Sequence, residues 1–192
     1  MLNRPDLHPQ LGQVLGDFTA LSLLQVRGAA GVTFVQRARS IGVQLFEDLD
    51  HSRFTGVEVL RELARLQGRG ADLMPVVFTS GIGSVERLLG DCARLLQPPS
   101  YMISQTPQVW IDCQVSDQYG GLQVGWDERV GVLPEGMVAS MFAAYLDLLQ
   151  RLAEDAQVWQ ARGDIVLPQQ LAVQAPQQVA DFLRQLNTRT TP

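Results

Sequence analysis

The sequence predicts an α/β fold in which amphipathic helices pack against a mixed β-sheet. Short apolar segments alternate with longer segments whose apolar residues recur every three or four positions, as in amphipathic helices. Residues 108–115 alternate apolar and polar side chains, the period of a β-strand. The glycine-containing turn at 117–121 joins this strand to a second alternating segment, which indicates a hairpin. A hairpin within alternating strands and helices makes the sheet mixed rather than purely parallel.

In the first half of the chain, the apolar pattern predicts strands and helices in alternation. Phe34, Ile41 and Leu45 fall on one face of a helix, and Gly68 and Gly70 follow the next helix as stop signals. The expected elements are a buried strand at 19–26, helices at 32–50 and 57–67, a buried strand at 75–80 and a helix at 85–96.

In the second half, the strand expected at 108–115 is the most informative element. Its apolar face would carry Val109, Ile111, Cys113 and Val115, and its other face Gln108, Trp110, Asp112 and Gln114. The apolar face can pack under helices, whereas the polar face would line a cavity if it is covered. A helix at 137–152, after the second hairpin strand, and a short helix at 177–186 complete the expected elements.

Length and composition bound the function. The 192 residues fit one globular domain or one lobe of a larger domain. The net charge of -5 disfavours a nucleic-acid-binding surface. Because every basic residue is Arg, lysine Schiff-base enzymes and P-loop nucleotide hydrolases are excluded.

Cysteine and histidine are too scarce for a structural zinc site. The chain holds only Cys92 and Cys113, which form no CxxC pair, and only His8 and His51. A hydrolase built on a nucleophile and a histidine would have to use one of those two histidines. No apolar run approaches membrane-spanning length and the N-terminus is polar, so the cytoplasm is the expected compartment.

Asp112 is the first candidate for chemistry. A carboxyl group on the polar face of a central strand loses hydration, which suits a general acid or base near neutral pH. An Asp that pairs with an Arg or caps a loop would also fit the pattern. Thr79 and Ser80 end a strand before Gly81, where hydroxyls could face a site or form an ordinary turn.

The segment 104–108 is dense in uncharged hydrogen-bonding groups. It would bind a polar substrate arm, or satisfy the loop backbone; its candidates are Ser104, Gln105, Thr106 and Gln108. Asp17 is expected to brace a loop, and Asp117 to be solvated in the hairpin turn.

Three longer strings together resemble one family. Residues 16–24 (GDFTALSLL) resemble the pattern DFTxLxLL, and residues 75–80 (PVVFTS) resemble PVVFTSxL, although Gly81-Ile82 follows. Residues 104–112 (SQTPQVWID), with Trp126-Asp127 beyond them, resemble SQTPQVxLD…WD. These are the motifs of heterocyclization domains of nonribosomal peptide synthetases, and the resemblance spans roughly residues 7–153.

The resemblance implies a chloramphenicol-acetyltransferase-like lobe. Complete domains of this family place two such lobes across a tunnel, and the first lobe carries a DxxxxD motif that nothing before Asp17 supplies. Residues 1–153 are therefore expected to form the C-terminal lobe alone, inactive without the N-terminal lobe. Residues 154–192 would form a Gln/Pro-rich extension.

The resemblance also implies an activity. Two peptidyl carrier proteins deliver substrates on phosphopantetheine, and the domain condenses an acyl thioester with Cys, Ser or Thr. It then closes a thiazoline or oxazoline ring with loss of water. The family's catalytic Thr and Asp correspond to Thr79 and Asp112. Gln108 and Gln114 project from the same strand face as Asp112 and are expected to line the tunnel, and Trp126 and Asp127 are expected to have structural roles. No directly bound cofactor, nucleic acid or membrane is expected; the other partner would be the missing lobe or another synthetase chain.

Three hypotheses remain at this point. The chain is the acceptor-side half of a cyclization enzyme, a non-catalytic module that binds carrier proteins, or an unrelated small acyltransferase. Intact Thr79 and Asp112 favour the first, and the lack of an HHxxxDG string disfavours the third.

We expect Asp112 and Thr79 to approach each other at one wall of a cleft. We also expect an exposed apolar surface where the first lobe would dock.

Overall fold

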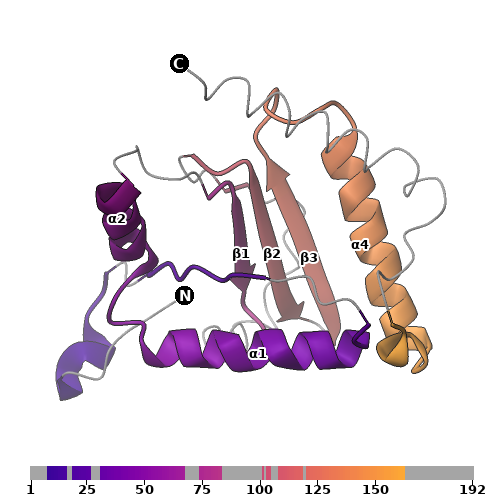
Figure 1. Ribbon diagram of the computed structural model, residues 1–192, viewed down its shortest axis with the longest axis horizontal. Coiled ribbons are helices and arrows are strands. Elements are labelled where there is room, and N and C mark those ends of the chain that lie inside the picture. Colours follow the sequence, from indigo (N-terminus) through magenta and orange to yellow (C-terminus); the bar gives the residue numbers. More distant parts are fainter. Residues whose placement is uncertain are drawn as a thin grey trace. The chain divides into compact units, whose positions relative to one another are not determined.

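The computed structural model describes residues 8–16, 19–26, 31–67, 74–83, 101, 103–104, 108–118 and 120–162 (Figure 1). By its internal contacts the chain divides into two units, which are described separately here. The first comprises residues 1–28 and 39–74, and the second residues 29–38 and 75–192. The division falls within helix α1 (Phe34–Asp50), which matches the helix expected at 32–50.

Helices make up most of the described part of the first unit. It holds the short 3-10 helix η1 (Pro9–Gln13), the larger part of α1, and α2 (Gly56–Gln67), which confirms the second expected helix. Thr55 and Glu58 begin α2 with reciprocal hydrogen bonds. The backbone N–H of Thr55 donates to Glu58 Oε2 over 2.7 Å, and the N–H of Glu58 donates to Thr55 Oγ1 over 3.4 Å.

This capping arrangement predicts a pH-dependent stability. The bonds from the backbone and hydroxyl of Thr55 hold the pKa of Glu58 below its usual value. A lowered folded-state pKa stabilises the fold above the unfolded pKa, and the effect is lost as pH falls through the folded pKa. We therefore expect Glu58→Gln to lower the urea midpoint at neutral pH, with the difference from wild type vanishing in acid. Glu135→Gln, at an exposed position outside α2, should show no such convergence.

The strand expected at 19–26 is wrong. The structure forms no strand over these residues, apart from an isolated bridge at Thr19. The carbonyl of Leu21 instead accepts a 2.7 Å hydrogen bond from the N–H of Gly56, at the first residue of α2. A Cβ atom on Gly56 would lie 2.9 Å from that oxygen, so the close approach requires glycine. The backbone of this apolar run therefore bonds to a helix start rather than to a neighbouring strand.

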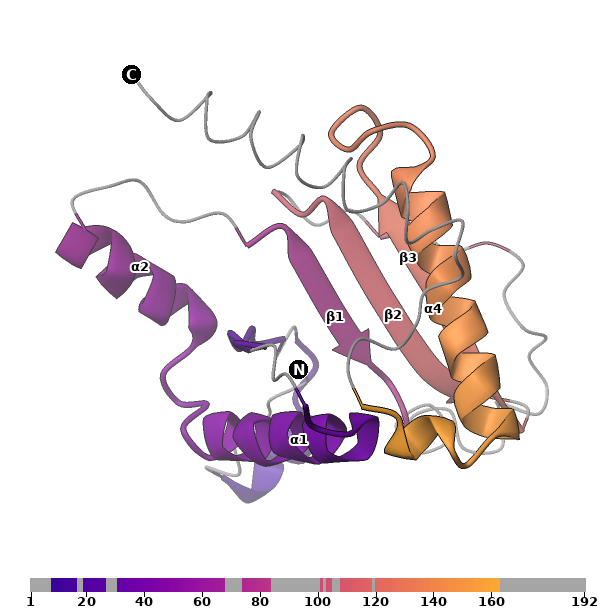
Figure 2. The ribbon, with the colours of Figure 1, turned by 45° about the vertical axis from the view of Figure 1, so that its right-hand side comes forward.

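The second unit is built on a three-stranded mixed sheet in the order β1-β2-β3. The strands are β1 (Val76–Ser80), β2 (Ile111–Gln118) and β3 (Gly121–Glu128). β1 pairs with β2 in parallel and β2 with β3 antiparallel, side by side as Figure 2 shows. This arrangement confirms the mixed α/β sheet and the hairpin. Gly120 lies in the hairpin connection with a φ of 75°, which favours glycine.

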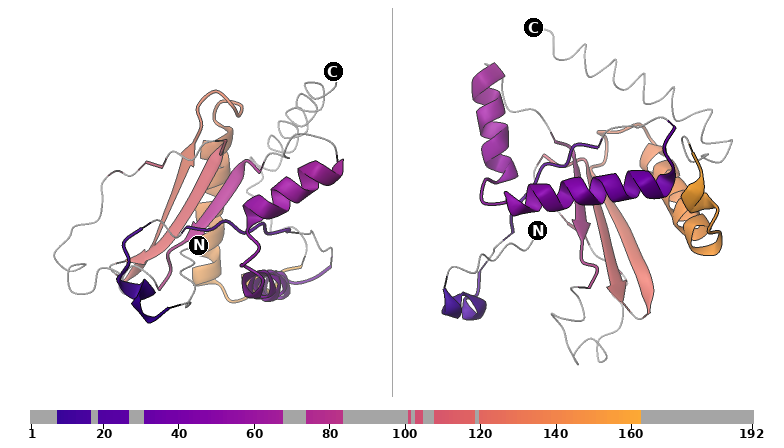
Figure 3. Two further views of the ribbon diagram at one scale, coloured as in Figure 1. Left: turned by 90° about the vertical axis from the view of Figure 1, so that its left-hand side faces the viewer. Right: turned by 60° about the horizontal axis from the view of Figure 1, so that its bottom comes forward.

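Helix α4 (Met137–Glu154) covers one face of the sheet, behind the strands in the left view of Figure 3. Ile111 and Cys113 of β2 form the buried core with Val138 of α4. Trp126 of β3 packs against two aromatic side chains of α4, with ring centroids 5.5 Å from Phe142 and 5.4 Å from Tyr145. The apolar face expected for β2 is therefore the helix-covered face, which leaves Asp112 on the other face.

β1 is not the buried strand that its composition predicted. Val76 and Phe78 are 58% and 65% exposed, and only Val77 is half-buried. The register places Val76 beside Ile111 and Phe78 beside Cys113, on the face that α4 covers over β2 and β3. The part of the sheet that α4 covers therefore comprises β2 and β3 and does not include β1. Val76 and Phe78 lie on the face opposite Asp112, so the docking surface expected on the Asp112 side stays a prediction.

The start of β2 also differs from expectation. The alternation was expected from Gln108, but the strand begins at Ile111 and Gln108 has a φ of 69°. The backbone N–H groups of Trp110 and Ile111 both donate to the carbonyl of Pro75, at 2.7 and 3.1 Å. This irregularity interrupts the period of two before Ile111, and Trp110 packs against the core cluster.

Beyond α4, the chain continues into a short 3-10 helix, η3 (Val158–Gln160), that the sequence did not predict. Trp159 Nε1 donates to the carbonyl of Leu152 over 2.8 Å, and the Trp159 ring lies edge-on to Phe34, 5.5 Å away. The expected helices at 85–96 and 177–186 lie outside the described residues, and the boundary at 153 stays a prediction. Among the helices described, none is long and apolar enough to cross a membrane.

Candidate active site

Asp112 is a buried carboxyl group on the face of the sheet opposite α4. Its side chain is only 7% exposed. One oxygen, Oδ2, accepts a short hydrogen bond from Ser104 Oγ and a 3.4 Å bond from Gln114 Nε2. The other oxygen, Oδ1, is buried and has no hydrogen-bond partner among the described residues. A buried carboxyl oxygen without a partner is costly, and a catalytic role is one reason why a protein keeps such a group.

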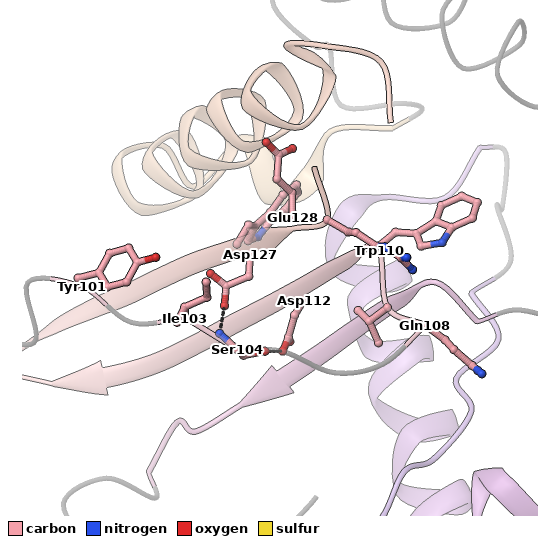
Figure 4. A pocket seen from close by; sticks show the side chains of 11 residues that line it. Tyr101, Ile103, Ser104, Gln108, Trp110, Asp112, Asp127 and Glu128 are labelled. Carbon is pink, nitrogen blue, oxygen red and sulfur yellow. Dashed lines mark hydrogen bonds between the residues drawn. The ribbon is translucent and has the colours of Figure 1, made fainter. Parts of the chain in front are cut away.

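Asp112 opens onto a cavity of about 790 Å³ at the start of β2 and the end of β3 (Figure 4). Asp112, Asp127 and Glu128 supply carboxyl groups to its wall, and Arg129 supplies a guanidinium. Aromatic and apolar side chains complete the lining: Tyr101, Ile103, Val109, Trp110 and Trp126, together with the polar Ser104 and Gln108. Six of the eleven lining residues are polar or charged, so the cavity combines apolar surface with several converging polar groups.

Ser104 joins the two carboxyl groups of the cavity wall. The antiparallel register places Asp127 of β3 directly opposite Asp112 of β2, so both side chains lie on one face. The backbone N–H of Ser104 donates to Asp127 Oδ2 over 2.7 Å, while its hydroxyl donates to Asp112. Figure 4 shows Ser104 between the two carboxylates.

Thr79 lies on the same face of the sheet as Asp112, but two residues further along the paired strands. The parallel register pairs Thr79 with Gln114, and Asp112 with Val77, so Thr79 and Asp112 are diagonal neighbours. Thr79 is exposed and is not among the described residues that line the cavity. The shared face agrees with the expected pairing, whereas direct contact between the two side chains stays a prediction.

The other candidate residues divide into three groups. Gln114 bonds to Asp112, and Gln108 lines the cavity from an exposed position. Ser80 is exposed at the end of β1. The remaining candidates, Asp17, Gln105 and Thr106, lie outside the described residues.

Asp117 was expected to be solvated in the turn, and the structure corrects this. It lies within β2, and its Oδ1 accepts a 2.7 Å hydrogen bond from the N–H of Gly83. The carboxylate thus ties the chain that follows β1 to the neighbouring strand.

The cavity residues that the sequence analysis missed are Tyr101, Ile103, Glu128 and Arg129. Glu128 and Arg129 directly follow the Trp126-Asp127 motif, which is the signal that would have pointed to them.

Cys113 is unsuited to nucleophilic chemistry. Burial, and then the negative charge of Asp112, raise the pKa of its thiol to about 11. The thiol therefore stays protonated at neutral pH, and the thiolate is the reactive form. Burial likewise raises the pKa of Tyr145, with a further contribution from Cys113. Within the described part of the chain, no group of three His, Cys, Asp or Glu side chains could hold a metal ion.

The raised thiol pKa predicts slow alkylation. In a Cys92→Ser variant, we expect Cys113 to react with iodoacetamide at pH 8 on the order of 100-fold more slowly than free cysteine. The same variant in urea should react at an ordinary rate, because unfolding restores the usual pKa. Mass spectrometry of the labelled protein measures both rates. Equal rates in the folded and unfolded protein would contradict the burial of this thiol.

Comparisons with known proteins show which proteins this chain is similar to. No protein-family model matches the chain. It is 62% identical over 178 residues to the pyochelin synthetase PchF of Pseudomonas aeruginosa, an alignment that covers 93% of this chain. It is also 38% identical over 168 residues to the phenyloxazoline synthase MbtB of Mycobacterium tuberculosis. The solved cyclization-docking bidomain of EpoB from Sorangium cellulosum matches with a TM-score of 0.63 and 36% identity over 83% of the chain. The chain is homologous to the cyclization domains of nonribosomal peptide synthetases.

A second solved synthetase structure, that of FmoA3 bound to AMPPNP, matches with a TM-score of 0.67 and 36% identity over 86% of this chain. These matches confirm the family resemblance and the expected chloramphenicol-acetyltransferase-like α/β fold. The chain spans 10% of the length of PchF, 12% of MbtB, 18% of the FmoA3 chain and 32% of the EpoB bidomain. The matching region is therefore one part of much larger enzymes.

Proposed function

We propose that this chain is the C-terminal lobe of a heterocyclization domain. Completed by an N-terminal lobe, it condenses a carrier-bound acyl thioester with Cys, Ser or Thr and closes a thiazoline or oxazoline ring. The observation that carries the proposal is Asp112: one carboxyl oxygen is held by Ser104 and Gln114, and the other is buried without a partner beside a cavity.

Ring closure needs a group that both accepts and donates a proton. The side-chain thiol or hydroxyl must lose a proton as it attacks the amide carbonyl, and the departing hydroxyl must gain one. A single positioned carboxyl group can do both in turn. Asp112 has the required free oxygen, and in this proposal Thr79 on the same face holds the departing hydroxyl by hydrogen bond.

The homologues support this reaction class. One solved structure is described as a cyclization-docking bidomain, and one relative as a phenyloxazoline synthase. The substrates in this proposal arrive on the phosphopantetheine arms of peptidyl carrier proteins, and the cavity at Asp112 receives the reacting end. In this proposal the N-terminal lobe would meet the face of the sheet that carries Asp112 and its cavity.

The experiment is a segment exchange in the most similar synthetase named above. The 178 matching residues of PchF are replaced by this chain, and pyochelin formation by the purified hybrid is measured by mass spectrometry. We expect the hybrid to make product, because the exchanged segments are 62% identical over 178 residues. A hybrid that folds and is loaded with substrates but makes neither amide nor ring would support the non-catalytic carrier-binding alternative.

A further inference from the structure

We propose that Ser104 is the positioning residue of Asp112, held in place by Asp127, and that this link fixes the orientation of Asp112 Oδ1. The inference deepens the proposed function, on which its catalytic consequence rests. Ser104 lies outside the sheet, yet it contacts two strands of it through two different groups. Its N–H bonds to β3 through Asp127, and its hydroxyl bonds to β2 through Asp112.

The register explains why such a link is needed. Asp112 and Asp127 stand directly opposite each other on neighbouring strands, and like charges in this position repel. Ser104 gives each carboxylate a donor, so the two side chains are held by one residue instead of turning away from each other. Hydrogen bonds to an ionised acceptor are roughly twice as strong as neutral ones, which makes the arrangement specific in geometry.

This link explains why the two oxygens of Asp112 differ in their hydrogen bonds. Ser104 Oγ and Gln114 Nε2 both donate to Oδ2 and leave Oδ1 without a described partner. A carboxyl group whose rotation is fixed by one oxygen presents the other in a constant direction. Catalytic groups gain from such preorganisation by neighbouring hydrogen bonds. Ser104 therefore acts through Asp112 rather than by binding substrate.

The first test uses this chain alone and does not depend on activity. The protein is labelled with ¹³C at aspartate carboxyl groups, and the Asp112 resonance is assigned from its loss in Asp112→Asn. We expect Ser104→Ala to move this resonance and Ser104→Thr, which keeps the hydroxyl, to restore it. Asp127→Ala should move it further than Asp127→Asn, because both remove the neighbouring charge but only Asn keeps an oxygen acceptor for the N–H of Ser104. An unmoved resonance in Ser104→Ala would overturn the proposed link.

The second test measures the consequence in the PchF hybrid. Loss of one hydrogen bond to a charged group predicts a fall in ring closure of about 10- to 100-fold in Ser104→Ala, with linear amide accumulating. Ser104→Thr should recover most of the ring product. Ring closure that is unaffected in Ser104→Ala would overturn the positioning role. A wild-type hybrid that makes no ring would instead count against the proposed function, while the carboxyl resonances still decide the link itself.

Discussion

Asp112→Asn in the PchF hybrid should abolish most ring closure while sparing amide formation. Amide formation joins a thioester with a good leaving group to a nucleophilic amine, so placement of the two substrates supplies much of the acceleration. Ring closure must expel a hydroxyl group, a poor leaving group without a proton donor. Removal of a positioned acid or base costs about two to four orders of magnitude in rate. Asn keeps the size of Asp112 and can still accept a bond from Ser104, but it cannot transfer the proton.

Mass spectrometry of the carrier-bound products measures this effect, because ring closure appears as the loss of one water. The linear amide should accumulate in the Asp112→Asn hybrid. Asp117→Asn is the matched control: Asp117 lies on the same strand but bonds to Gly83 and is not among the described residues lining the cavity. Full ring closure by the Asp112 variant would remove this carboxyl group from the mechanism. Equal loss of amide and ring would point to a role in folding or substrate placement.

Trp126→Ala should destabilise the second unit by about 3 kcal/mol, the low end of the range for a large aromatic side chain replaced by Ala. The Trp126 ring packs against Phe142 and Tyr145 of α4 and against the core cluster of Ile111 and Cys113. Its removal leaves a cavity between the sheet and its covering helix. Urea unfolding followed by circular dichroism measures the change in the free energy of unfolding.

Two variants serve as controls for this prediction. Trp126→Phe keeps an aromatic ring at the α4 contact and should cost less than Trp126→Ala. Leu122→Ala lies on the same strand at a side chain that is 49% exposed, so its effect should be within about 0.5 kcal/mol. A Trp126→Ala protein as stable as the Leu122→Ala protein would show that the contact between α4 and the sheet contributes little to the stability of this unit.

The local pattern of the sequence determined most of the elements that the structure describes. The helices α1, α2 and α4 carry apolar residues at helical spacing, and the hairpin of β2 and β3 has strict alternation around a glycine turn. Patterns of this kind depend on residues close together in the chain, so they can be read without knowing what packs against them. The same alternation placed Asp112 on the face opposite the helix, and the motif at 104–112 indicated the family.

Only the tertiary structure decided which apolar segments are buried and which polar groups meet. Residues 19–26 and 75–80 look alike in composition, yet the first forms no strand and the second forms one that is largely exposed. Burial depends on where α4 lies, and it covers β2 and β3. The link from Asp127 through Ser104 to Asp112 joins residues 23 and 8 positions apart, and it depends on the register of β2 with β3. Such contacts follow from strand pairing, which residue spacing alone does not specify.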